Sequence, residues 1–214
     1  MLFLAVFCGF LAENIREHVV EKRREQQFVK SLVQDIKLDL KNLDSLDKGW
    51  AIDYNNASKE KDLLAGNDVI TNSVPAFNLW DTSTGWDDFV PSDGTIQELK
   101  SSGGLRLITK RTVVDCIMAY QRAVDQTKSY NMALTDRQLN TLMRNELFDV
   151  ITIYNQKGQG KIPLLSTDKT LRNRAFGYIS SWQGSFKWLR YFGDQVRNRG
   201  MGLLSEIKKQ YGIL

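Results

Sequence analysis

The scarcity of helix-breaking residues is the feature of this sequence that most constrains its fold. The chain contains three prolines in 214 residues, and neither glycine nor proline occurs between Glu13 and Lys48. Proline lacks a backbone donor and clashes inside a helix, so its near absence favours long helices. No strand pattern of comparable strength occurs. The sequence therefore predicts an all-α fold.

Apolar residues at helical spacing predict where the first helix lies. Steps of three and four residues join Val29, Leu32, Ile36, Leu40, Leu43, Leu46, Trp50 and Tyr54. This spacing is typical of one amphipathic helix, which is expected to end near Gly66. The stripe is thin over residues 13–28, where acidic and basic residues alternate. We expect a helical stalk there, followed by a bundle domain over residues 29–214.

Two more long helices are expected in that domain. One begins at Thr109 and continues toward Tyr154, and the other begins at Thr167 or Asp168 and continues toward the C-terminal end. A short helix is expected from Thr95 to Ser101. Because amphipathic helices must bury their apolar stripes against one another, the sequence predicts an antiparallel bundle of three long helices plus a short helix.

Residues 67–92 interrupt the periodicity and are rich in aromatic residues. The segment contains Pro75, Pro91 and Gly85, together with Phe77, Trp80, Trp86 and Phe89. We expect a long loop here. Its aromatic side chains either cap the end of the bundle or form a binding surface.

The first twelve residues, MLFLAVFCGFLA, are uncharged and predominantly apolar. A membrane-spanning helix needs about 20 such residues, so we expect this segment to be the C-terminal part of a transmembrane helix that starts before Met1. A signal peptide and a buried core helix remain alternatives. The candidate anchor residues are Leu2, Phe3, Leu4, Val6, Phe7, Phe10 and Leu11. Basic residues after the segment, from Arg16 to Lys30, favour a cytoplasmic soluble part by the positive-inside rule.

The repertoire of chemically reactive residues is small. His18 is the only histidine, which excludes sites that need two or more of them, and no histidine on the same helix accompanies Cys116 as a base. We assign no catalytic, cofactor-binding or metal-binding residues. The net charge of +4 is uneven, with −7 over residues 43–100 and +10 over residues 101–214. Solvated surface, contact between segments and an anionic partner all remain open.

The last helix has more aromatic residues than one buried stripe needs. Trp188, Tyr191 and Phe192 fall beside or outside its apolar stripe. Together with Trp80, Trp86 and Phe89 they are the candidate partner-binding residues. Basic residues between the aromatics are compatible with nucleic acid, but a protein partner or a second copy of the chain is the preferred expectation.

Three segments of the chain resemble a family of uncharacterised, single-span inner-membrane proteins of Bacteroidota. They are LAVFCGFLAENIREH at residues 4–18, EKRREQQFVKSLVQDIKLDL at residues 21–40 and TIQELKSSGGLRLITKRTVVDCIMAY at residues 95–120. The resemblance implies an N-terminal transmembrane helix with a periplasmic helical domain, which opposes the cytoplasmic orientation given by the visible charges. We follow the resemblance for the orientation. It implies no catalytic residues.

Together these patterns predict a membrane-anchored, non-enzymatic helical protein, an accessory or scaffolding subunit of an inner-membrane assembly. The lipid bilayer and a protein partner or homo-oligomer are the expected partners, without nucleic acid and without a cofactor. A sensory or ligand-binding helical bundle coupled to a transmembrane helix is the alternative. It would need a pocket between helices that is lined by convergent polar groups.

Overall fold

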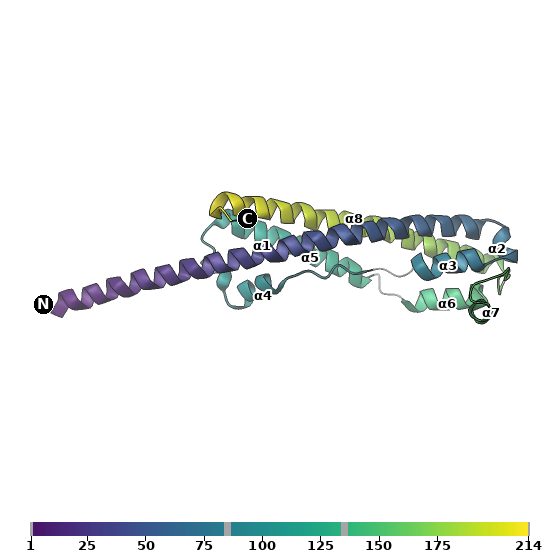
Figure 1. Cartoon of the computed structure of the whole chain (residues 1–214), viewed down its shortest axis with the longest axis horizontal. Coiled ribbons are helices and arrows are strands. Elements are labelled where there is room, and N and C mark those ends of the chain that lie inside the picture. Colours follow the sequence, from purple (N-terminus) through teal and green to yellow (C-terminus); the bar gives the residue numbers. More distant parts are fainter. Residues whose placement is uncertain (1, 84–86, 134–136, 214) are drawn as a thin grey trace. The chain divides into compact units, whose positions relative to one another are not determined.

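The computed structural model describes residues 2–83, 87–133 and 137–213, and all the regular structure in these ranges is helical. In chain order the elements are α1 (Leu2–Ala65), α2 (Asp68–Thr71), α3 (Val74–Ser83), α4 (Gly94–Ser101), the 3-10 helix η1 (Gly104–Leu107), α5 (Arg111–Ala133), α6 (Arg137–Leu147), α7 (Val150–Asn155) and α8 (Lys169–Tyr211). Figure 1 labels the α-helices. The prediction of an all-α fold is confirmed.

The chain folds into two compact units, where the sequence predicted a single bundle domain. Unit 1 comprises Met1–Asn42, Val90–Val124 and Val196–Leu214, and unit 2 comprises Leu43–Phe89 and Asp125–Gln195. The long helices α1, α5 and α8 each contribute residues to both units.

In unit 1, hydrogen bonds fix the directions of the helices around α1. The carboxylate of Glu25 accepts from the backbone N–H and the hydroxyl of Thr109 at 2.6 and 2.9 Å, and also from the Tyr211 hydroxyl. The Tyr120 hydroxyl donates to Asp39. Thr109 bonds to residue 25 and Tyr120 bonds to residue 39, so the residue numbers of both segments increase in the same direction. Helix α5 therefore runs parallel to α1 in this unit. The prediction that the second long helix is antiparallel to the first is wrong here.

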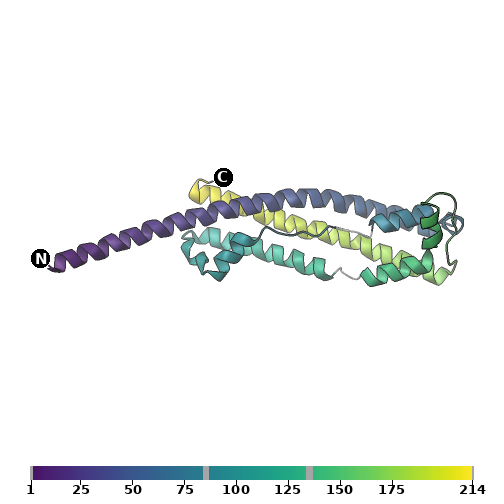
Figure 2. The ribbon, with the colours of Figure 1, turned by 60° about the horizontal axis from the view of Figure 1, so that its bottom comes forward.

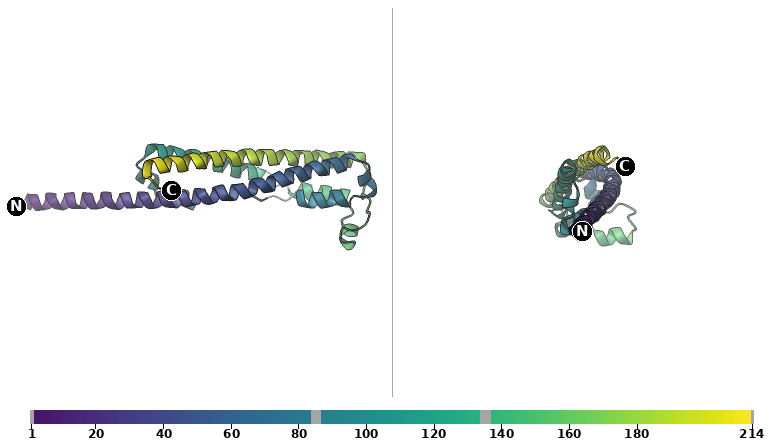
Figure 3. Two further views of the ribbon diagram at one scale, coloured as in Figure 1. Left: turned by 45° about the horizontal axis from the view of Figure 1, so that its top comes forward. Right: turned by 90° about the vertical axis from the view of Figure 1, so that its left-hand side faces the viewer.

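The chain reverses twice between α1 and α5, which explains the parallel direction. The Ser92 N–H donates to Asp39 at 2.7 Å and the Thr95 N–H donates to Asp35 at 3.3 Å. The following helix α4 ends at the level of Arg24, where Ser102 and Arg24 line the same cleft, so α4 is antiparallel to α1. After η1 the chain reverses direction a second time, and α5 follows. Figure 3 shows the C-terminal end of α8 beside α1, consistent with the bond from Tyr211 to Glu25.

The apolar stripes predicted from the sequence form the buried interior of both units. On α1, Val29, Leu32, Ile36, Leu43 and Trp50 are buried, and Leu40, Leu46 and Tyr54 are half-buried. On α8, the apolar stripe consists of residues at helical spacing: Leu171, Ala175, Trp182, Leu189, Val196, Leu203 and Ile207 are buried, and Tyr178 is half-buried. Burial of these side chains is the main favourable term in the stability of such helices.

Two predicted elements differ from the structure. The segment expected as a loop over residues 67–92 contains α2 and α3, because Pro75 lies in the first turn of α3, where its missing N–H costs no helical hydrogen bond. The helix expected from Thr109 toward Tyr154 is divided into α5, α6 and α7. Asp149 begins the last of these, since its side chain accepts from the Thr152 N–H at 3.0 Å.

Two glycines of α8 in unit 1 make a testable contrast. A Cβ atom at Gly200 would lie 3.2 to 3.3 Å from Leu40, Ile36 and Tyr120, whereas no described atom lies within 4 Å of one at Gly202. We expect Gly200→Leu to lower the free energy of unfolding by about 2 kcal/mol through overpacking. Gly202→Leu is expected to raise it by about 0.5 kcal/mol through helix propensity. Denaturant unfolding of both variants tests the contrast, and equal effects would contradict the close approach at Gly200.

Candidate interaction surfaces

The N-terminal part of α1 exposes large apolar side chains. Phe10 is 67% exposed and Ile15 is 65% exposed, and Val6, Phe7 and Leu11 are also exposed. In Figure 2 the purple first turns of α1 extend beyond α4, α5 and the end of α8. We name residues 6–15 the apolar segment. Contiguous exposed apolar surface of this kind marks a site of contact with a membrane or a protein.

Four of the seven candidate anchor residues can be compared with the structure. Val6, Phe7, Phe10 and Leu11 lie in the apolar segment and are exposed. Leu2, Phe3 and Leu4 belong to the backbone of α1, but they lie outside the residues whose side chains are described. Within the described ranges, no helix contains a stretch that is both long and apolar enough to cross a membrane.

A second exposed surface lies on unit 2, where α8 carries adjacent aromatic rings. Trp188 is 55% exposed and Tyr191 is 51% exposed, and Phe192 beside them is half-buried. The ring centroids of Trp188 and Tyr191 are 5.8 Å apart, those of Tyr191 and Phe192 are 5.4 Å apart, and Tyr130 of α5 lies 5.2 Å from Phe192. We name these four residues the aromatic patch. The sequence analysis did not identify Tyr130, because its role depends on contact between two helices.

The other three candidate partner-binding residues do not join this patch. Trp80 is 0% exposed and packs between Phe148 and Tyr178, with ring centroids 5.8 Å away in each case. Phe89 is 2% exposed. Both therefore lie in the interior of unit 2 and present no surface to a partner, which corrects the expectation for them. Trp86 lies outside the described residues.

Burial raises the pKa of two carboxyl groups, those of Asp39 and Asp53. Burial raises the pKa of the Asp39 carboxyl, although hydrogen bonds from Tyr120 and Ser92 act in the opposite direction. Burial, with a smaller contribution from the charge of Asp87, raises the pKa of Asp53 to about 6. No group of three or more metal-ligating side chains occurs among the residues that the structure describes.

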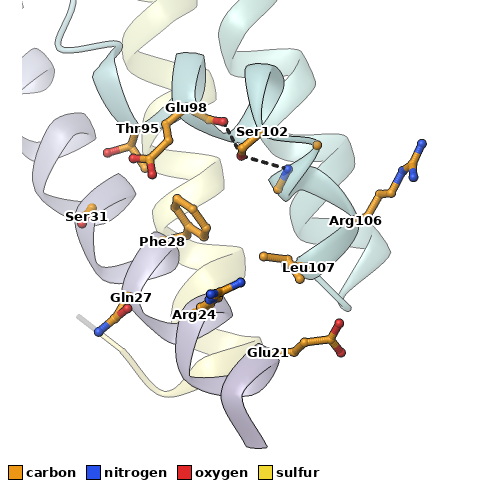
Figure 4. Close-up of a pocket in the computed structure, with 12 residues that line it drawn as sticks. Glu21, Arg24, Gln27, Phe28, Ser31, Thr95, Glu98, Ser102, Arg106 and Leu107 are labelled. Atoms are coloured by element: carbon orange, nitrogen blue, oxygen red, sulfur yellow. Dashed lines mark hydrogen bonds between the residues drawn. The ribbon is translucent and has the colours of Figure 1, made fainter. Parts of the chain in front are cut away.

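Unit 1 has two clefts next to α1. The larger, of 940 Å³, lies between α1 and the turn from α4 to η1, and Figure 4 shows Phe28 and Leu107 facing it, with Arg24 beside them. The Ser102 hydroxyl shapes this turn by donating to the Glu98 carbonyl at 2.6 Å and accepting from the Gly104 N–H at 3.3 Å. The second cleft, of 530 Å³, includes Lys22, Lys110 and Tyr211.

No family model matches the chain, and neither a curated protein nor a solved structure matches it. The resemblance to inner-membrane proteins of Bacteroidota gains no support from these comparisons. The structure thus defines an all-helical protein of two compact units that has an exposed apolar segment and an exposed aromatic patch.

Proposed function

We propose that this protein is a membrane-anchored, non-enzymatic helical protein that serves as an accessory or scaffolding subunit of an inner-membrane assembly. The observation that carries the proposal is the exposure of Val6, Phe7, Phe10, Leu11 and Ile15 along α1. Transfer of a large apolar side chain from water to an apolar phase is favourable by about 1.5 to 3 kcal/mol. Insertion into a bilayer removes several such side chains from water at once.

The apolar N-terminal residues of the described chain account for about half of the thickness of the hydrocarbon layer. Residues 2–12 of α1 have a helical length of about 16 Å, compared with a hydrocarbon layer of about 30 Å. The anchor in this proposal includes all seven candidate residues, and the resemblance to single-span proteins supports a periplasmic position for the two units. No catalytic role is proposed, since the sequence contains a single histidine and offers no histidine base to activate Cys116 as a nucleophile.

The aromatic patch is the surface proposed for contact with another subunit. Tryptophan and tyrosine contribute disproportionately to protein interfaces because they bury a large, rigid area and retain a polar group for a hydrogen bond. Trp188 and Tyr191 are both exposed, adjacent and on a continuous helix, which are the properties of such an interface. The proposed occupant is a protein subunit in the same membrane, and a second copy of this chain is the simplest case.

The double variant Trp188→Ala/Tyr191→Ala is expected to weaken this association by roughly tenfold or more, since loss of an interface anchor costs about 2 kcal/mol. Chemical crosslinking of the full chain in native membranes measures the effect as a loss of higher-mass adducts. The mass of the adduct distinguishes a second copy from another subunit.

Tyr154→Ala provides the control, because Tyr154 is an exposed aromatic residue of unit 2 outside the aromatic patch. It should leave the adducts unchanged. Crosslinking that traps only monomer for the unaltered protein would contradict the scaffolding role.

A further inference from the structure

The end of unit 1 from which the apolar segment extends is formed by three chain segments at one level of α1. Glu25 receives hydrogen bonds from Thr109, just before α5, and from Tyr211, the last residue of α8. The turn from η1 to α5 and the last turn of α8 are therefore held beside the same part of α1. Glu25 lies thirteen residues after Ala12, where the uncharged run ends.

Basic residues are in excess at this end of unit 1. Over residues 17–26, α1 is balanced, with three acidic residues and three basic residues. The excess comes from the neighbouring segments, which contribute five exposed cations. We name them the basic collar: Arg106, Lys110, Arg111, Lys208 and Lys209. Among the described residues no salt bridge involves the basic collar, although the charge of Lys209 contributes to lowering the pKa of the nearby Glu206 carboxyl.

The two clefts of unit 1 meet at the basic collar. Glu21, Arg106 and Leu107 line both clefts, Arg24 lines the larger, and Lys22 and Lys110 line the smaller. The larger cleft balances Arg24 and Arg106 with Glu21 and Glu98, whereas the smaller has three cations against Glu21 and Glu25, so the excess of positive charge lies at the smaller cleft. In Figure 4, Arg24 lies close to Leu107 while Arg106 extends away from the ribbon toward solvent. Such an arrangement suits an anionic group that approaches along α1.

The distance along α1 sets how far the basic collar lies from a membrane surface. The helical rise puts Glu25, to which the collar segments are bonded, about 20 Å beyond Ala12. The headgroup layer occupies about 5 to 7 Å of this distance, which leaves about 13 Å, less than two Debye lengths at physiological ionic strength. Cations at that level interact with an anionic membrane surface, and the interaction is weakened by salt.

We propose that the basic collar binds the headgroups of anionic phospholipids and so holds unit 1 against the membrane surface. This inference rests on the proposed membrane anchoring, because the apolar segment is what brings the collar to the lipid. It adds a preference for lipid charge, which anchoring alone does not require.

Binding of the full chain to vesicles tests the inference. One set contains phosphatidylcholine only, and the other contains 30% phosphatidylglycerol, with about 0.05 or 0.3 M salt. The collar variant has glutamine at positions 106, 110, 111, 208 and 209. We expect it to bind the anionic vesicles at least about tenfold more weakly than the unaltered chain at low salt. Its binding to neutral vesicles should be unchanged.

A charge-matched control places glutamine at five exposed cations of unit 2: Lys59, Lys157, Lys161, Lys169 and Arg174. It should bind both kinds of vesicle like the unaltered chain. Equal losses for the collar and control variants, or no preference of the unaltered chain for anionic vesicles, would overturn the collar's role while leaving anchoring intact. Absence of binding to either kind of vesicle would instead overturn the proposed anchoring.

Discussion

The variant with serine in place of Phe7, Phe10, Leu11 and Ile15 is expected to lose membrane retention while both units remain folded. All four side chains are exposed, so their replacement removes no buried contact from either unit. If each contributes about 1.5 kcal/mol or more on transfer to lipid, the four together change the partition by more than about a thousandfold. Flotation of the full chain with vesicles measures this loss.

A matched variant separates the apolar segment from exposed apolar surface in general. Leu38, Ile52, Ile151 and Leu165 are also exposed but lie elsewhere in the chain. Their replacement by serine should leave flotation unchanged. If both variants float equally well, or equally poorly, the apolar segment is not the anchor.

Trp80→Ala is expected to destabilise unit 2 by about 4 kcal/mol. Trp80 is fully buried, stacks on Tyr178 and meets Phe148 edge to face. Truncation of such a residue costs both its burial and the cavity that remains, typically 3 to 5 kcal/mol. Hydrogen exchange followed by mass spectrometry measures the loss as faster exchange within Leu43–Phe89 and Asp125–Gln195, the ranges of unit 2.

Trp188→Ala is the control for this prediction because its side chain is largely exposed on the same unit. Its effect on exchange should correspond to less than about 1 kcal/mol, in keeping with a surface substitution. The two tryptophans should thus show opposite behaviour, with Trp80 controlling stability and Trp188 controlling association. Comparable exchange in the two variants would contradict the assignment of Trp80 to the interior.

Helical periodicity predicted the long helices well because the stripes of α1 and α8 extend over many turns. Positions such as Leu32, Leu43 and Leu203 are buried as their spacing indicates. The direction of α5 relative to α1 could not be predicted. It depends on the segment through Ser92 and Thr95, whose backbone N–H groups bond to Asp39 and Asp35 of a distant helix.

Short sequence patterns gave wrong predictions at positions where distant contacts or helix position decide the structure. Pro75 indicated a loop, although a proline in the first turn of a helix is well tolerated, as in α3. Glu25 lies in the segment expected to be a helical stalk, yet it is buried in unit 1, as is Asp39. Their hydrogen-bond partners come from α5, α8 and the segment before α4, so no local pattern identifies them.

The candidate interaction residues divide according to tertiary packing. Trp80 and Trp188 are chemically identical, and both occur near other aromatics in the sequence. Phe148 and Tyr178 cover Trp80, whereas Trp188 stays exposed beside Tyr191 and Phe192. The sequence could therefore identify an excess of aromatic residues but could not determine which of them are covered. The basic collar likewise combines cations from two segments that are distant in the sequence, residues 106–111 and 208–209.

The native cysteines permit a direct measurement of whether the apolar segment enters a bilayer. Cys8 is exposed within this segment, and Cys116 can be replaced by serine so that a nitroxide label reacts at position 8 alone. In vesicles we expect the label to collide frequently with oxygen, which concentrates in the hydrocarbon, and rarely with a water-soluble nickel chelate. Frequent collisions with the chelate, equal to those of a label at exposed position 59, would contradict membrane insertion of α1.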